Sequence, residues 1–151
     1  MNEKTILSID RTKPFDPVAF IGNKGWRIEE QDEQSLALTE VDPAMIRLET
    51  CRTQSEEFIT SEENLRRLKA GGYVRLDARV FQALWENQQL IPDAWTKIDQ
   101  MLYYICFPGT ILTYSDKRRF VLCLLWGDGI WDWKYFCLDL DWFGSSAVLA
   151  P

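Results

Sequence analysis

The sequence contains no histidine. Histidine is the usual acid–base catalyst near neutral pH, the partner that activates serine and cysteine nucleophiles, and a common metal ligand. A single chain of this composition therefore cannot form a Ser-His-Asp triad, a Cys-His pair or a histidine metal site. Any catalysis would have to use carboxylates, lysine, tyrosine, cysteine or a Ser-Lys pair.

Long apolar runs and excess positive charge are also missing. No stretch of about 18 apolar residues is present, and the polar start at Met1–Lys4 lacks the apolar core of a secretory signal. We therefore expect no membrane span, and the sequence leaves both the cytoplasm and the cell surface open. The net charge of −6 and pI near 4.7 argue against a nucleic-acid partner, because phosphate binding requires clustered Lys and Arg.

The four cysteines and the glycines form no recognised cofactor motif. Cys51, Cys106, Cys123 and Cys137 have no CxxC spacing, so neither a zinc site nor a redox motif is indicated, and free thiols are expected. Gly127 and Gly129 do not belong to a GxGxxG or GxxxxGK[ST] phosphate loop. The sequence predicts neither a cofactor nor a metal.

The composition predicts one α+β domain covering residues 1–151, since 46% of the residues are hydrophobic and the length suits a single core. Apolar runs predict an early strand at Thr5–Ile9 and extended pieces at Trp26–Ile28 and Leu36–Val41, which flank a charged turn at Glu29–Ser35. Asp16-Pro17 predicts a short helical turn that ends at Gly22.

Two helices and a hairpin follow. Thr60-Ser-Glu-Glu63 has the form of a capping box, which predicts a helix to about Ala70, and Asp77 is the expected cap of a second helix that stops before Pro92. The runs Phe120–Trp126 and Ile130–Phe136, separated by Gly127-Asp128-Gly129, predict a β-hairpin. Ser146–Ala150 is expected to be a closing strand.

Aromatic residues are concentrated near the C-terminus, where 12 of the 20 lie between Tyr103 and Phe143. Tryptophan and tyrosine suit both cores and binding surfaces. We expect at least two of Trp126, Trp131, Trp133 and Trp142 to pack beneath the hairpin. The residues between them have mixed chemistry that no single reaction requires, which favours a binding surface.

Two other functions are compatible with the same segment. Asp128, Asp132, Asp139 and Asp141 lie close in sequence, so a carboxylate-dependent hydrolase is an alternative, provided that two carboxyl groups converge in a pocket. Solvated aspartates in turns and strand edges are the simpler interpretation. A structural protein whose exposed rings form a permanent subunit interface is the third reading.

Several stretches resemble one protein family: Ser8–Gly22 (SIDRTKPFDPVAFIG), Arg75–Asn87 (RLDARVFQALWEN), Leu90–Trp95 (LIPDAW) and Ser146–Ala150 (SAVLA). Together they resemble the variable proteins of diversity-generating retroelements in little-cultivated archaea and bacteria. In these systems a reverse transcriptase copies a template with errors at adenines, and the copy replaces a coding segment near the end of the gene. The resemblance implies a non-enzymatic ligand-binding protein on a C-type-lectin-like fold, with two helices, antiparallel strands and a C-terminal hairpin that carries the variable surface.

The implied ligand is a protein or a cell-surface molecule, and the implied variable region spans residues 103–144. AAC and AAT codons changed at their adenines never encode Trp, Lys, Met, Gln or Glu, so the resemblance makes the four hairpin tryptophans fixed scaffold. The positions that it implies to be diversified and ligand-binding are Tyr114, Asp116, Arg118, Phe120, Cys123, Leu125, Gly127, Asp128, Ile130, Asp132, Tyr135, Phe136, Asp139, Leu140, Asp141, Phe143 and Gly144.

Some features depart from the family pattern. Lys134 is unreachable from such a codon, and Cys137 stands where the family leads us to expect tryptophan. The sequence also lacks the Glu-Pro-Asn and Gln-Pro-Asp motifs of sugar-binding lectins. Calcium-dependent carbohydrate binding is therefore not implied.

Overall fold

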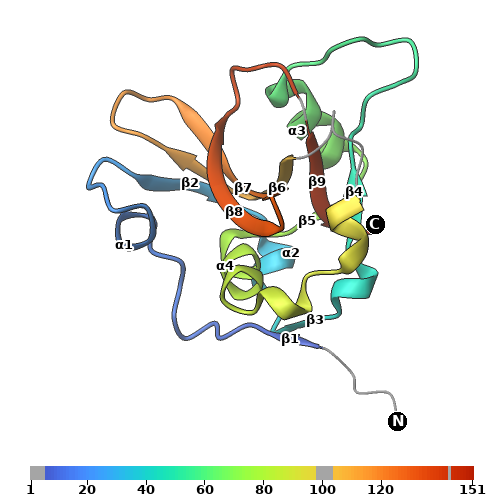
Figure 1. Ribbon diagram of the computed structural model, residues 1–151. Coiled ribbons are helices and arrows are strands. Elements are labelled where there is room, and N and C mark those ends of the chain that lie inside the picture. The colour runs from blue at the N-terminus through green and yellow to red at the C-terminus, as the bar shows by residue number, and fades with distance from the viewer. Residues whose placement is uncertain (1–5, 98–103, 143) are drawn as a thin grey trace.

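The computed structural model describes residues 6–97, 104–142 and 144–151, which form a mixed α+β structure (Figure 1). Two main helices accompany a seven-stranded sheet and a separate two-stranded sheet. The elements are β1 Leu7–Ser8, α1 Pro17–Ile21, β2 Arg27–Gln31, α2 Glu33–Leu36, β3 Glu40–Val41, β4 Arg47–Glu49, α3 Ser61–Ala70, β5 Val74–Arg75, α4 Ala78–Glu86, β6 Tyr104–Thr113, β7 Arg119–Gly127, β8 Ile130–Cys137 and β9 Gly144–Leu149, with 3-10 turns at Pro43–Met45, Gln88–Leu90 and Asp93–Lys97.

The large sheet is mixed rather than purely antiparallel. Its strand order is β4-β9-β6-β7-β8, while β2 also pairs with β6 and β5 also pairs with β9. All these pairs are antiparallel except β6 with β9, whose register places Tyr104 opposite Gly144. The expected antiparallel strands thus make up most of the sheet, but the closing strand β9 lies beside β6 and runs in the same direction.

The helices α3 and α4 pack on opposite faces of this sheet. On one face, Val80, Phe81 and Leu84 of α4 belong to the larger apolar core together with inward-facing residues of β6 and β7. On the other face, Leu65 of α3 packs in a smaller core with Cys106, Cys123 and Trp142. The central strands β6 and β7 are thus covered on both sides.

Local sequence signals placed both helices correctly. The Thr60 hydroxyl accepts a hydrogen bond from the Glu63 amide at 3.1 Å, as an N-cap should. The Glu63 carboxylate does not return to the cap, because it pairs with Arg66 instead. Asp77 caps α4 by accepting the amide of Arg79 at 3.0 Å, and the helix ends well before Pro92.

A buried ion pair fixes the start of α4. Asp77 is fully buried, and its carboxylate accepts hydrogen bonds from the Arg11 guanidinium and the Ser35 hydroxyl. Burial opposes ionisation of Asp77, but the bonds from Arg11 and Ser35 outweigh it, so the pKa of Asp77 lies below its ordinary value. These contacts tie the first loop and α2 to the first turn of α4.

The N-terminal region contains more regular structure than expected. Residues 29–35, expected to be a charged turn, instead complete β2 and form α2. Glu29 and Glu30 can occupy a strand because Arg119 of β7, which lies across β6 from β2, forms ion pairs with both. Of the early strand expected at Thr5–Ile9, Leu7–Ser8 form β1, which pairs with β3, and Thr5 lies outside the described residues.

Strand β6 was not recognised in the sequence because Pro108-Gly109 interrupts it. The register between β6 and β7 shifts between Phe107 and Leu112, so this dipeptide lies in a bulge. A Cβ atom on Gly109 would clash with the backbone of Arg75 and Leu76. The bulge therefore lets the segment that leads into α4 pass close to the central strand.

Cys106 and Cys123 form a disulfide between β6 and β7, and both residues are fully buried. The expectation of free thiols was wrong for this pair, since the strand register places the two residues directly opposite each other. Cys51 and Cys137 are free. Across the described ranges, no helix is long and apolar enough to span a membrane.

Candidate functional site

The predicted hairpin consists of β7 and β8, joined by Asp128 and Gly129 alone because Gly127 already pairs with Ile130. Asp128 has φ 52° and Gly129 has φ 77°. Two successive residues with positive φ are typical of the type I′ turn, whose twist suits a two-residue hairpin. The connection is therefore one residue shorter than expected.

The strand period divides the hairpin side chains into two faces. Trp131 and Trp133 lie half-buried against the larger core, while Ile130, Asp132 and Lys134 are exposed. Trp142 is buried in the smaller core. The expectation that at least two tryptophans pack beneath the hairpin is thus confirmed.

Four of the candidate ligand-binding positions are buried. Phe120 and Phe136 have 4% and 8% of their surface exposed, and Cys123 is in the disulfide. A Cβ atom on Gly144 would lie 2.5 Å from the Tyr104 carbonyl oxygen, so the parallel pairing of β6 with β9 requires glycine there. Cys123 and Gly144 thus serve the scaffold. Phe143 lies outside the described residues.

The other candidates are exposed or half-buried, but they do not form one continuous patch. Tyr114, Asp116 and Arg118 belong to the turn between β6 and β7. Another group lies on the hairpin tip and β8: Leu125, Gly127, Asp128, Ile130, Asp132 and Tyr135. A further group, Asp139, Leu140 and Asp141, lies in the loop that packs against the start of α3, where the Ser61 hydroxyl donates to the Leu140 carbonyl oxygen at 2.8 Å.

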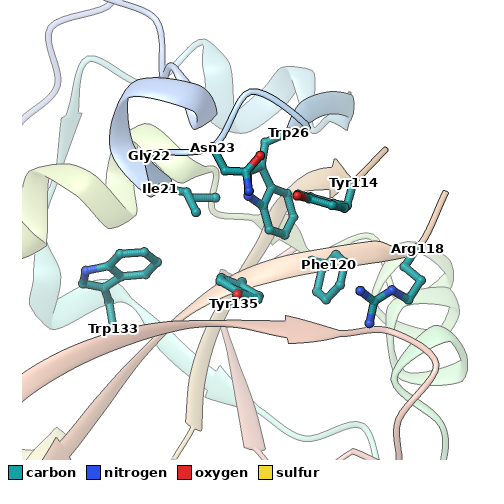
Figure 2. Close-up of a pocket in the computed structure, with 9 residues that line it drawn as sticks. All are labelled: Ile21, Gly22, Asn23, Trp26, Tyr114, Arg118, Phe120, Trp133 and Tyr135. Atoms are coloured by element: carbon teal, nitrogen blue, oxygen red, sulfur yellow. The ribbon is translucent and has the colours of Figure 1, made fainter. Parts of the chain in front are cut away.

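A pocket of about 560 Å³ lies near these positions (Figure 2). Pockets of this size are typical of small-ligand sites. Tyr114, Arg118, Phe120 and Tyr135 line one part of it, and all four were candidate positions. The remaining lining residues are Ile21, Gly22, Asn23, Trp26 and Trp133.

Trp26 is the centre of the aromatic wall. Its ring centroid lies 4.8 Å from that of Tyr114, 5.0 Å from that of Phe120 and 4.9 Å from that of Tyr135. At the other end of the pocket, Trp133 packs against Phe20 of α1, with the two ring centroids 4.7 Å apart. Such tilted and edge-on contacts are favourable between aromatic rings and hold the wall in place.

Arg118 supplies the charge at the pocket. Its Nε donates to Asp116, and its guanidinium lies 5.3 Å from the centre of the Phe120 ring. The hydrogen bond that Arg118 donates to Asp116 raises the pKa of Arg118. The Arg118 amide and then its guanidinium lower the pKa of Asp116. In the described part of the chain, no hydrogen-bond partner is recorded for the two terminal nitrogens of Arg118, unlike those of Arg119.

Sequence reasoning missed the N-terminal side of this pocket. Gly22 was predicted only as a helix end, and it adopts the left-handed conformation there with φ 89°. Asn23 and Trp26 carry no local signal for a site. They reach the pocket because β2 pairs with the far end of β6, which brings the preceding loop onto the hairpin.

The four aspartates considered for catalysis do not converge in the pocket. Asp128, Asp132, Asp139 and Asp141 are all exposed, and none lines the pocket in Figure 2. Over the ranges that the structure describes, no group of three or more His, Cys, Asp or Glu side chains is placed to hold a metal. The hydrolase alternative therefore lacks the converging pair that it requires.

Comparison with family models, with curated proteins and with solved structures finds no match for this chain. The sequence and the geometry of the hairpin and the pocket are accordingly the basis for its function.

Proposed function

We propose that this chain is a non-enzymatic ligand-binding protein with a C-type-lectin-like fold, whose C-terminal surface is diversified by a retroelement. The observation that carries the proposal is the exposure of most candidate positions on a hairpin whose framework is rigidly held. Ile130, Tyr135 and Leu140 are 67%, 48% and 53% exposed, although large apolar side chains are usually buried. Each of these side chains offers apolar contact area that a partner can bury on binding.

The scaffold beneath these positions suits repeated substitution. The disulfide between β6 and β7 and the packing of Trp131 and Trp133 stabilise the hairpin independently of the exposed side chains. Changes at Ile130 or Asp132 therefore leave the core intact. The proposed ligand is a protein or a cell-surface molecule, since a surface spread along a hairpin presents a large contact area.

Sequencing the DNA that flanks the gene tests the proposal. We expect a reverse-transcriptase gene and a near-copy of the segment encoding residues 103–144 that differs from it at adenines of the copy. The differences should fall on codons for exposed positions such as Asp132, and should spare Cys123 and Gly144. The absence of both the reverse-transcriptase gene and the near-copy would contradict the proposal.

A second candidate function is a permanent subunit interface, favoured by the exposure of Ile130 and Tyr135 on β8. Among the described strands, β8 pairs only with β7, and an unpaired strand edge can join another chain. Light scattering over a wide concentration range decides between the two functions. A monomer at every concentration excludes the interface, whereas a stable oligomer that is lost in Ile130→Asp supports it.

A further inference from the structure

Among the described residues that line it, the pocket combines aromatic walls with the guanidinium of Arg118. Figure 2 shows Trp133 toward one end and Arg118 toward the other, with Tyr135 between them and Ile21 opposite. A flat apolar group can therefore lie against Tyr135 and Trp133 while a charged group reaches Arg118.

Trp133 and Tyr135 provide the apolar half. Trp133 is half-buried against Phe20, so one side of the indole is held and the remainder borders the pocket. Tyr135 is fixed in the same way by Trp26 and Phe120, yet 48% of its surface is exposed. Rings held in this manner bind another ring with little loss of conformational entropy.

Arg118 provides the charged half. Asp116 accepts a hydrogen bond from its Nε and orients the guanidinium, and no described residue accepts a hydrogen bond from its terminal nitrogens. A guanidinium binds a carboxylate through two parallel hydrogen bonds. The adjacent Arg119 cannot serve in this way, because its nitrogens already bind Glu29, Glu30 and Glu62.

The same charge argues against the other ligand class that aromatic pockets bind. Cages of tryptophan and tyrosine commonly recognise quaternary ammonium groups. Here the permanently charged Arg118 lines the pocket and would repel a cation. The occupant that satisfies both halves is a ring that carries negative charge.

We propose that this pocket binds an aromatic ring joined to a carboxylate, with the ring on Trp133 and Tyr135 and the carboxylate on Arg118. This inference rests on the proposed binding function and specifies it for this chain. Trp26 and Trp133 belong to the fixed framework, whereas Arg118 and Tyr135 are candidate diversified positions. The ring-binding wall is therefore partly constant, and the preference for a carboxylate is a property of the residue at position 118.

The test uses matched small probes with the full chain. N-acetyl-phenylalanine and N-acetyl-phenylalaninamide differ only in the carboxylate, acetate lacks the ring, and tetramethylammonium tests the opposite charge. Titrations are followed by NMR shifts of the indole N–H groups, with those of Trp26 and Trp133 assigned from Trp→Phe variants. We expect the carboxylated probe to shift both signals and to bind at least about 5-fold more tightly than the amide, as one charged hydrogen-bonded pair allows.

Variants locate the two halves of the interaction. Arg118→Gln should remove the preference for the carboxylate and leave binding of the amide unchanged. Tyr135→Ala should weaken the binding of both phenylalanine probes. Arg66→Gln is the matched control, because Arg66 is an exposed arginine that also pairs with a nearby carboxylate, Glu63, but lies on α3 away from the pocket. The Arg66→Gln variant should bind both phenylalanine probes with the same affinity as the unaltered protein.

The opposite outcomes are equally clear. Equal affinity for the two phenylalanine probes, tighter binding of tetramethylammonium, or a preference that survives in Arg118→Gln would overturn the assignment. Failure here is distinguishable from failure of the proposed function. A flanking retroelement with an unresponsive pocket removes only the pocket assignment, whereas a responsive pocket without a retroelement removes only the diversification.

Discussion

Strands β7 and β8 are neighbours in one hairpin, yet they differ sharply in burial. Five successive residues of β7, from Phe120 to Leu124, are buried, whereas Phe136 is the one buried residue of β8. The cause is position: β7 lies between two strands and under both cores, while β8 lies at the sheet edge. Stability therefore depends on β7, and β8 is the strand that can change without loss of the fold.

The strongest test of this contrast is truncation of one aliphatic side chain on each strand. Leu122→Ala in β7 should lower the free energy of unfolding by about 3 to 4 kcal/mol, because it leaves a cavity in a fully packed core. Ile130→Ala in β8 should change it by less than about 0.5 kcal/mol, since the side chain is 67% exposed. Urea unfolding measures both, and similar losses would refute the contrast.

Removal of the disulfide tests how much the central strands depend on their cross-link. The cysteines are 17 residues apart, and a loop of this size predicts a loss of about 3 kcal/mol for the double variant Cys106→Ala with Cys123→Ala. Urea unfolding with and without a thiol reductant provides the measurement. If the reductant lowers the free energy of unfolding of the unaltered protein but not that of the double variant, the effect belongs to the disulfide.

The buried ion pair tests a part of the scaffold that lies outside both strands. Asp77→Asn should lower the free energy of unfolding by about 2 kcal/mol at neutral pH, because it weakens charged hydrogen bonds to Arg11. The pKa of Asp77 is lowered in the folded state, so its contribution is present above the ordinary value of 3.8 and disappears as the pH falls through the folded-state pKa. The difference between the two proteins should therefore shrink in acid.

The smallest expected effect concerns the hairpin turn, whose backbone conformation restricts which residues can occupy this part of the exposed surface. Asp128 has positive φ, a conformation that glycine and asparagine adopt readily and β-branched residues avoid. Asp128→Val should cost about 1 kcal/mol, whereas Asp128→Asn should be neutral. Thermal unfolding monitored by circular dichroism compares the two. Equal stability would show that the turn imposes no such restriction.

Elements with local signals were predictable from the sequence. Thr60 and Asp77 cap their helices through neighbouring amides, and the hairpin follows from two apolar runs around a glycine-containing turn. Each of these signals depends on residues a few positions apart. Their success reflects the short range of capping and turn interactions.

The remaining elements depend on contacts that local patterns do not reveal. Strand β6 contains Pro108-Gly109, a dipeptide that normally marks a turn. Glycine is needed at position 109 because the backbone of β5 and of the segment leading into α4 passes close to it. Likewise, the disulfide requires the register between β6 and β7. The pocket needed the pairing of β2 with β6, which brings Trp26 onto the hairpin from almost the opposite end of the sequence.

The position of Trp26 also limits how the pocket can evolve. One ring contacts the side chains at positions 114, 120 and 135, so a larger or smaller residue at one of them changes the space left for the others. Substitutions that share a contact in this way do not add independently. The effect of a substitution at one of the three positions on the shape of the pocket therefore depends on the residues at the other two.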